Sequence, residues 1–233
     1  RSVAAYVVDK YARDMASGAW AVNGQTIKFG RTGRLIDGQH RLHACVKSGR
    51  EFSAVVVKGL DEKVFETFDL GARRSVGDIL IDRGESNTST LAAMLRQVWL
   101  LESGLLTSQN ASPTVAEMLA VLDENPEIRD SVRWVHKVKY ITAPTLLLAL
   151  HYQFSRVDRS LADLFIERLS DGAELAKKHP ILTLRDQLLR ARNERKYQQA
   201  DPERAAWIIK AWNAFVEDRP LDHIKWQPSG ARA

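Results

Sequence analysis

The residues best suited to chemistry form one short run, from Asp37 to Arg41. The sequence around it predicts a strand that ends at Asp37, a sharp turn at Gly38 and a helix that begins at once. The first N–H groups of a helix have no partner within the helix, and the helix dipole favours an anion beside them. His40 and Arg41 add side-chain donors in the first turn, where cations are intrinsically disfavoured. The run therefore predicts a site for a negatively charged ligand.

Two members of the run have further candidate roles. Gly38 lets a ligand approach the backbone, and the Asp37 carboxylate is placed to hold a metal ion or to accept a proton. A simpler interpretation is a satisfied strand–turn–helix in which Arg41 only pairs with Asp37. We favour that interpretation for an isolated Asp-Gly pair, but not for the whole run.

This run resembles the signature box of the ParB/sulfiredoxin superfamily. In ParB proteins the box reads Gly-Glu-Arg-Arg, two further residues and Ala, and it cradles nucleotide phosphates. Three residues of this chain match it: Gly38, Arg41 and Ala44. Gln39 and His40 replace the Glu and the first Arg. The form Asp-Gly-Gln-His-Arg is most similar to the Asp-Gly-His-His-Arg of ParB-like free serine kinases, and it also resembles the box of DndB-like proteins in DNA-modification systems.

A second box of the superfamily has a looser counterpart in residues 68–75. ParB proteins place Glu-Asn-x-x-Arg after a strand and a short helix, and this box supplies a metal-binding carboxylate and a phosphate-binding arginine. The resemblance implies Asp69 as the carboxylate and Arg73 or Arg74 as the phosphate ligand, since arginine binds phosphate through a planar fork. Leu70 stands where the Asn is expected, and this departure weakens the match.

The resemblance implies a nucleotide-binding protein that acts on or with DNA. ATP or CTP with Mg²⁺ would lie between the two boxes, with phosphates on the backbone of Gly38 and Gln39. Asp37 or Asp69 would hold Mg²⁺ or orient a nucleophile, and His40 would contact a phosphate or act as an acid. The arginines that would neutralise the phosphate charge are Arg41 and Arg73 or Arg74.

Three alternatives to this function remain open. One is a kinase that moves a phosphoryl group to a hydroxyl of a small molecule or a modified base, with an aspartate as base. Another is a non-catalytic module for DNA binding or protein interaction. The weakest is a nuclease in which two aspartates and His40 serve one Mg²⁺ ion. The sequence does not decide whether the chain is an enzyme. The two enzyme classes considered are an NTPase and a kinase.

The elements around these boxes predict an α+β fold in two domains. Residues 1–85 alternate helical and strand patterns and form the ParB/sulfiredoxin-like α/β domain, and residues 86–227 read as an all-helical domain before a frayed tail at 228–233. In the first domain we expect helices at 3–17, 39–48, 62–68 and 76–81, and strands at 26–29, 34–37 and 54–57. Leu42, Cys45 and Val46 would form the apolar face of the second helix. In the second domain we expect a helix started by Ser112 with Pro113 at its first position, and a helix through Ile128, Val132 and Val135, among others.

Basic residues of the helical domain suggest a DNA partner. Arg129, Arg133 and Lys137 recur every four residues, so they would share one helix face. The turn at Asn125-Pro126 between two predicted helices is similar to a helix–turn–helix, which ParB proteins carry after their nucleotide domain. A second cluster contains Arg190, Arg192 and Arg195. The alternative is a solvated helix face with no nucleic acid.

Composition excludes several other classes. The chain has 233 residues, a net charge of +5 and a single cysteine, Cys45. One cysteine rules out a disulfide framework and multi-cysteine metal sites, and Gln39 stands where sulfiredoxins have their cysteine, so thiol chemistry is not expected. There is no Gly-x-Ser-x-Gly elbow, His-Glu-x-x-His helix or P-loop. No apolar run is long enough for a membrane span. We expect a cytoplasmic protein, with a homodimer as one candidate assembly.

Overall fold

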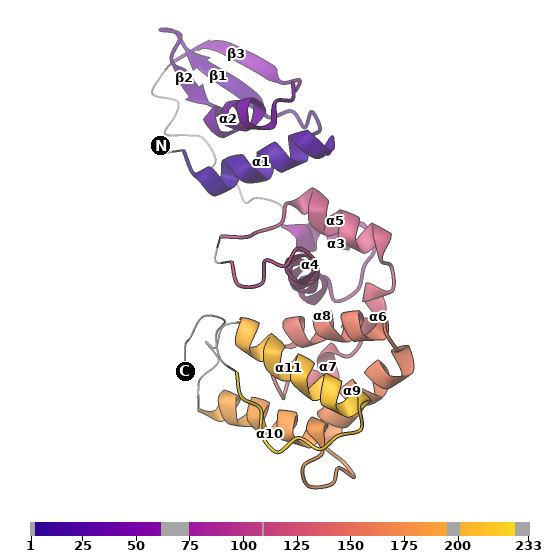
Figure 1. Ribbon diagram of the computed structural model, residues 1–233. Helices are drawn as coiled ribbons and strands as arrows, with labels where there is room; N and C mark the ends of the chain where they lie inside the picture. Colours follow the sequence, from indigo (N-terminus) through magenta and orange to yellow (C-terminus); the bar gives the residue numbers. More distant parts are fainter. Residues whose placement is uncertain (1–2, 62–74, 109, 195–200, 227–233) are drawn as a thin grey trace. The chain divides into compact units, whose positions relative to one another are not determined.

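The computed structural model describes residues 3–61, 75–108, 110–194 and 201–226 (Figure 1). Within these residues the chain combines a small sheet with many helices, which confirms the mixed α+β class. The chain divides into two compact units. The first unit comprises Arg1–Ser75 with Ser112–Glu117, and the helical unit comprises Val76–Ala111 with Met118–Ala233.

The division between the units falls ten residues earlier than the predicted boundary at residue 85. The cause is α3 (Val76–Asp82), which the sequence assigned to the first domain. Its Leu80 is fully buried in the core of the helical unit, together with Leu91 of α4 (Thr88–Glu102). A short helix belongs to the unit whose residues bury its apolar face. Distance along the sequence does not determine which unit that is.

The first unit places a three-stranded sheet, counted over the described residues, beside two helices. Its elements follow in chain order: α1 (Ala5–Ser17), β1 (Thr26–Gly30), β2 (Leu35–Asp37), α2 (Gln39–Ser48) and β3 (Val55–Leu60). The strand order is β2-β1-β3. β1 and β2 match two of the predicted strands and form an antiparallel hairpin, in which Lys28 lies opposite Asp37, and β3 pairs with β1 in parallel.

Helices α1 and α2 pack on each other through small and apolar residues. Val8, Ala12 and Met15 of α1 form a buried cluster with Ala44 of α2, and Cys45 packs at its edge. The expected apolar face of α2 is therefore partly wrong. Leu42 and Val46 are exposed, Val46 to 83%. The buried face is rotated toward Ala44, because that face meets α1.

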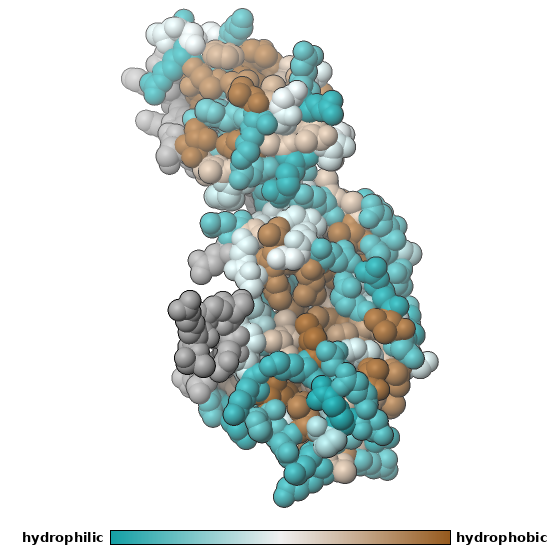
Figure 2. Space-filling model, in the orientation of Figure 1, coloured by the Kyte–Doolittle hydropathy of each residue, from teal (hydrophilic) through white to brown (hydrophobic). Residues whose placement is uncertain are grey.

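Large apolar side chains remain exposed in the first unit, and Figure 2 shows brown apolar atoms between teal polar ones on its visible face. Val55 and Val56 of the edge strand β3 are half exposed, in addition to Val46. Single exposed apolar residues are normal at protein surfaces. The exposure of these residues alone therefore does not identify a binding partner.

The helical unit packs its elements around α8 (Pro144–Ser155), whose residues are buried on most sides. Phe154 of α8 stacks on Trp212, with ring centroids 4.3 Å apart, and Phe165 meets Trp212 edge-on. Trp207 and Trp212 are both buried and belong to this core. The other helices in the described residues of this unit are α6 (Ile128–Val132), α7 (Val135–Val138), α9 (Arg159–Asp171), α10 (Pro180–Asn193) and α11 (Asp201–Val216). It also contains α5 (Val115–Glu124) from Met118 onward.

Two helix predictions for residues 112–138 are wrong. α5 does not start at Pro113: it begins at Val115, after a capping box in which the Thr114 hydroxyl accepts the N–H of Glu117 at 3.1 Å and the Glu117 carboxylate accepts the N–H of Thr114. The helix predicted through residues 128–135 is split into α6 and α7. The N–H of Trp134 bonds to the Ser131 carbonyl three residues back, and this tighter turn interrupts the α-helix.

None of the helices in the described part of the chain has the length and apolar character that crossing a membrane requires.

Candidate functional site

The predicted strand–turn–helix is present, with the predicted helix bounds. β2 ends at Asp37, α2 begins at Gln39, and Gly38 between them has a φ of +103°. Gly38 is also buried against β1. A Cβ atom at Gly38 would come 2.4 Å from Cδ1 of Ile27. The sequence assigned Gly38 to the close approach of a ligand. The structure instead places Ile27 where its side chain would be, so glycine is needed here for the turn and for packing on the sheet.

Asp37 lies in a ring of hydrogen-bond donors. Its Oδ1 accepts the N–H of Gly38 at 2.7 Å, and its Oδ2 lies 3.2 Å from Nζ of Lys28 and 3.4 Å from Nη2 of Arg41. Two cations therefore face this carboxylate. That arrangement does not suit Asp37 as a direct ligand of Mg²⁺, because a divalent cation would be held against both positive charges. The described residues also contain no group of three or more His, Cys, Asp or Glu that could hold a metal ion.

Arg41 is buried although it carries a charge, with a residue exposure of 7%. Its Nη2 donates to the carbonyl oxygen of Thr26 at 2.9 Å, in addition to the long contact with Asp37. Its Nη1 is buried and has no hydrogen-bond partner within the described ranges. A buried donor without an acceptor costs about 1–3 kcal/mol, and more when it is charged. The pairing of Arg41 with Asp37 is thus present but leaves the guanidinium incompletely satisfied.

His40 has a partner far away in the sequence. The backbone N–H of Ala4, just before α1, donates to Nε2 of His40 at 3.0 Å. Lys47 near the end of α2 pairs with Asp9 of α1 at 2.5 Å. These two contacts show that α1 and α2 run in the same direction, with their N-termini at the same end of the first unit. The resemblance assigned His40 to phosphate contact or acid catalysis, and the structure places its Nε2 on backbone instead.

Residues 68–74 of the second predicted box lie outside the described residues. Asp69, Arg73, Arg74 and the helix predicted at 62–68 belong to the part of the chain outside the described residues. The same holds for Arg195 in the second basic cluster.

The basic face predicted in the helical unit is largely paired with acids. Arg129 donates from Nε to Glu85 at 2.9 Å and from Nη2 to the second carboxylate oxygen. This hydrogen-bonded pair lowers the pKa of Glu85 and raises that of Arg129. Arg133 pairs with Asp130 at 2.7 Å. The cations therefore do not form one unneutralised stripe, and the break between α6 and α7 removes the shared helix face.

The other basic residues have separate surroundings. Lys137 lies over the ring of Trp134, with Nζ 4.7 Å from the centroid. Arg192 donates to the carbonyl of Tyr140, and Arg190 is exposed on α10. The helix after the Asn125-Pro126 turn is α6, which ends after five residues. That is short for a recognition helix, which must present several side chains to a groove.

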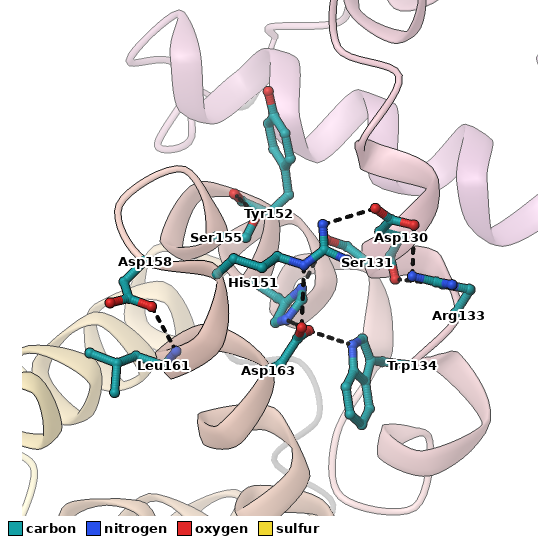
Figure 3. A network of polar contacts seen from close by, with 11 residues as sticks. Asp130, Ser131, Arg133, Trp134, His151, Tyr152, Ser155, Asp158, Leu161 and Asp163 are labelled. Atoms are coloured by element: carbon teal, nitrogen blue, oxygen red, sulfur yellow. Dashed lines mark hydrogen bonds and ion pairs between the residues drawn. The ribbon is translucent and has the colours of Figure 1, made fainter.

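Sequence reasoning missed a buried polar network in the helical unit. Figure 3 shows His151 of α8 between Ser131 of α6 and Asp163 of α9. Nδ1 of His151 lies 2.8 Å from the Ser131 hydroxyl, and its Nε2 lies 3.2 Å from Oδ1 of Asp163. The indole N–H of Trp134 donates to the same carboxylate oxygen at 3.3 Å, and Nε of Arg159 donates to the other oxygen. Ser131, His151 and Asp163 lie on three different helices, and no local sequence motif connects them.

This network has the order of a nucleophile, base and orienting acid, but its burial excludes that role. Ser131 is 1% exposed and His151 is 2% exposed, so a substrate cannot reach the hydroxyl. Burial lowers the pKa of His151 to about 4, and the nearby Asp163 opposes this only in part. The imidazole is therefore neutral near pH 7. It joins α6, α8 and α9 as a structural contact.

Comparisons of the chain with protein-family models, with curated proteins and with solved structures give no match.

Proposed function

We propose that the first unit binds the phosphates of a nucleoside triphosphate, ATP or CTP, at the N-terminus of α2. The observation that supports this most directly is Arg41. Its guanidinium is buried in the first turn of α2, and Nη1 has no acceptor among the described residues. A phosphate oxygen is a strong acceptor for a guanidinium N–H and would meet this need once the groups that cover Nη1 move aside. The resemblance to the ParB box leads to the same residue and the same ligand.

Two positively charged side chains lie beside one carboxylate at this turn. Lys28 and Arg41 contribute two positive charges, and Asp37 contributes one negative charge. The N-termini of α1 and α2 lie at the same end of the first unit, and each adds partial positive charge. Asp37 contacts both cations at more than 3 Å, which is longer than a typical charge-assisted hydrogen bond. A polyphosphate carries more charge than this carboxylate and would compete for the same donors.

The proposal extends to DNA only through the family resemblance. The pairing of Arg129 and Arg133 with acids in the helical unit makes the nucleotide the better first ligand to test. Mg²⁺ would bind as a companion of the nucleotide phosphates. Release of free phosphate, or transfer of phosphate to an added alcohol, would distinguish an NTPase from a kinase.

The test is calorimetric titration with ATP, CTP, GTP and ADP, each with and without Mg²⁺. We expect wild type to bind at least one triphosphate, and Arg41→Lys to bind it at least tenfold more weakly, because lysine keeps the charge but loses the fork. Arg50→Ala is the matched control, since Arg50 is exposed just beyond the other end of α2. We expect this control to bind as wild type does.

A thermal-shift series separates loss of binding from loss of folding. A ligand at 100 times its dissociation constant adds about 2.7 kcal/mol of stability, and this gain should disappear in Arg41→Lys. The melting temperature without ligand reports any damage to the contact with Thr26. If no triphosphate binds wild type, or if Arg41→Lys and Arg50→Ala bind equally well, the site is not the one proposed.

A further inference from the structure

The contact between His40 and Ala4 fixes the protonation of the imidazole. A backbone N–H can only donate, so Nε2 of His40, 3.0 Å away, must accept. A ring nitrogen that accepts carries no proton. His40 is therefore neutral in this arrangement, with its proton on Nδ1. A neutral imidazole whose Nε2 is occupied cannot donate from that atom to a phosphate or to a leaving group.

The same contact attaches one helix N-terminus to another. Ala4 is the N-cap residue of α1, and no side chain of its own caps this helix. His40 lies in the first turn of α2, next to the buried Arg41. Farther along, the hydroxyl of Ser48 at the end of α2 lies 3.9 Å from Sδ of Met15 near the end of α1, so the two helices stay parallel beyond this contact. The imidazole thus keeps the positive end of α1 beside the positive end of α2.

We infer that His40 is a positioning residue of the phosphate site: its Nε2 holds the N-terminus of α1 so that one ligand faces two helix ends. This inference rests on the proposed function. It differs from the role that the family resemblance gives to this position, which is direct phosphate contact or acid catalysis. Arg41 supplies the side-chain contact to the phosphate, and His40 supplies the second helix dipole.

Two amide substitutions test the inference. In His40→Gln the side-chain oxygen lies three bonds beyond Cβ, as Nε2 does, and it can accept the Ala4 N–H. In His40→Asn the oxygen lies only two bonds beyond Cβ and cannot reach as far. We expect His40→Gln to bind the nucleotide within threefold of wild type, and His40→Asn at least tenfold more weakly. His43→Gln, at an exposed position of the same helix, is the control and should bind as wild type does.

The outcomes separate the possible roles of His40, with affinity measured by calorimetry and folding by the melting temperature without nucleotide. Equal loss of affinity in His40→Gln and His40→Asn would mean that the imidazole itself binds the phosphate, which overturns the inference and leaves the proposed function standing. A lower melting temperature in His40→Asn with unchanged affinity would reduce His40 to a structural residue and also overturn it. Absence of nucleotide binding by wild type would overturn both proposals.

Discussion

Gly38 meets two separate physical constraints at one position. Its φ of +103° lies in a region that side chains other than glycine adopt only at a cost. Its missing side chain also leaves room for Ile27, which is buried in β1. Gly33 in the β1–β2 turn shares the first constraint, with a φ of +81°, but a Cβ there would meet no atom within 4 Å. The two glycines therefore separate backbone strain from steric contact.

We expect Gly38→Ala to destabilise the protein by about 2–3 kcal/mol and Gly33→Ala by about 1 kcal/mol, because both pay for the backbone but only the first meets Ile27. Urea denaturation measures both free energies of unfolding. The double variant Gly38→Ala with Ile27→Val lacks Cδ1, the atom that the new Cβ would meet at 2.4 Å, and should cost less than the sum of the two single variants. Strict additivity would show that the contact with Ile27 carries no energy.

At the scale of elements, helix bounds were predicted most accurately where residues at both ends of the helix signal its start and its end. α2 has its predicted bounds because Gly38 and Gly49, both with positive φ, mark its two ends. Prediction failed at the break between α6 and α7, where no glycine marks a helix end. Between α6 and α7 the indole of Trp134 reaches Asp163, which lies 29 residues away. No local pattern contains that contact, and the apolar spacing through residues 128–135 continues across the break.

The N-terminus of α9 offers a test of a single helix cap. The carboxylate of Asp158 accepts the N–H of Leu161 at 2.9 Å, so it satisfies one of the first N–H groups of the helix. We expect Asp158→Ala to reduce the free energy of unfolding by about 1 kcal/mol, and Asp158→Asn to retain most of it, because asparagine also caps. Chemical denaturation at neutral pH measures both. Equal losses in the two variants would point to the charge of Asp158, rather than its hydrogen bond, as the source of stability.

At the scale of the whole molecule, local patterns located the candidate site but not its contacts. The strand, turn and helix that carry Asp37 to Arg41 were predicted from adjacent residues, because glycine and apolar spacing act locally. His40 accepts the N–H of Ala4, which lies 36 residues away in the sequence. Arg41 donates to the carbonyl of Thr26, which lies 15 residues away. Such partners depend on how helices and strands pack. The placement of α3 in the helical unit was missed for the same reason.

The buried histidine of the helical unit makes the stability of the molecule depend on pH. The pKa of His151 is about 4 in the folded protein because of burial, against about 6.5 for an exposed histidine. Above pH 6.5 both states are neutral at this site, and it contributes no pH dependence. As the pH falls below 6.5, the unfolded chain binds a proton that the folded protein excludes, so stability decreases. The loss levels off below about pH 4, at about 3 kcal/mol.

Comparison of wild type with His151→Gln isolates this effect from the other groups that titrate. Glutamine is neutral at all pH values, and its amide can still donate to Asp163. We expect urea denaturation to give wild type a loss of about 2 kcal/mol between pH 7 and pH 5 beyond that of the variant, whatever the constant cost of the substitution. Other histidines, including His179, whose pKa is also lowered by burial, are present in both proteins and cancel. Parallel curves for the two proteins would mean that His151 accepts a proton in the folded state, with Asp163 stabilising its charge, and that α6, α8 and α9 stay joined in acid.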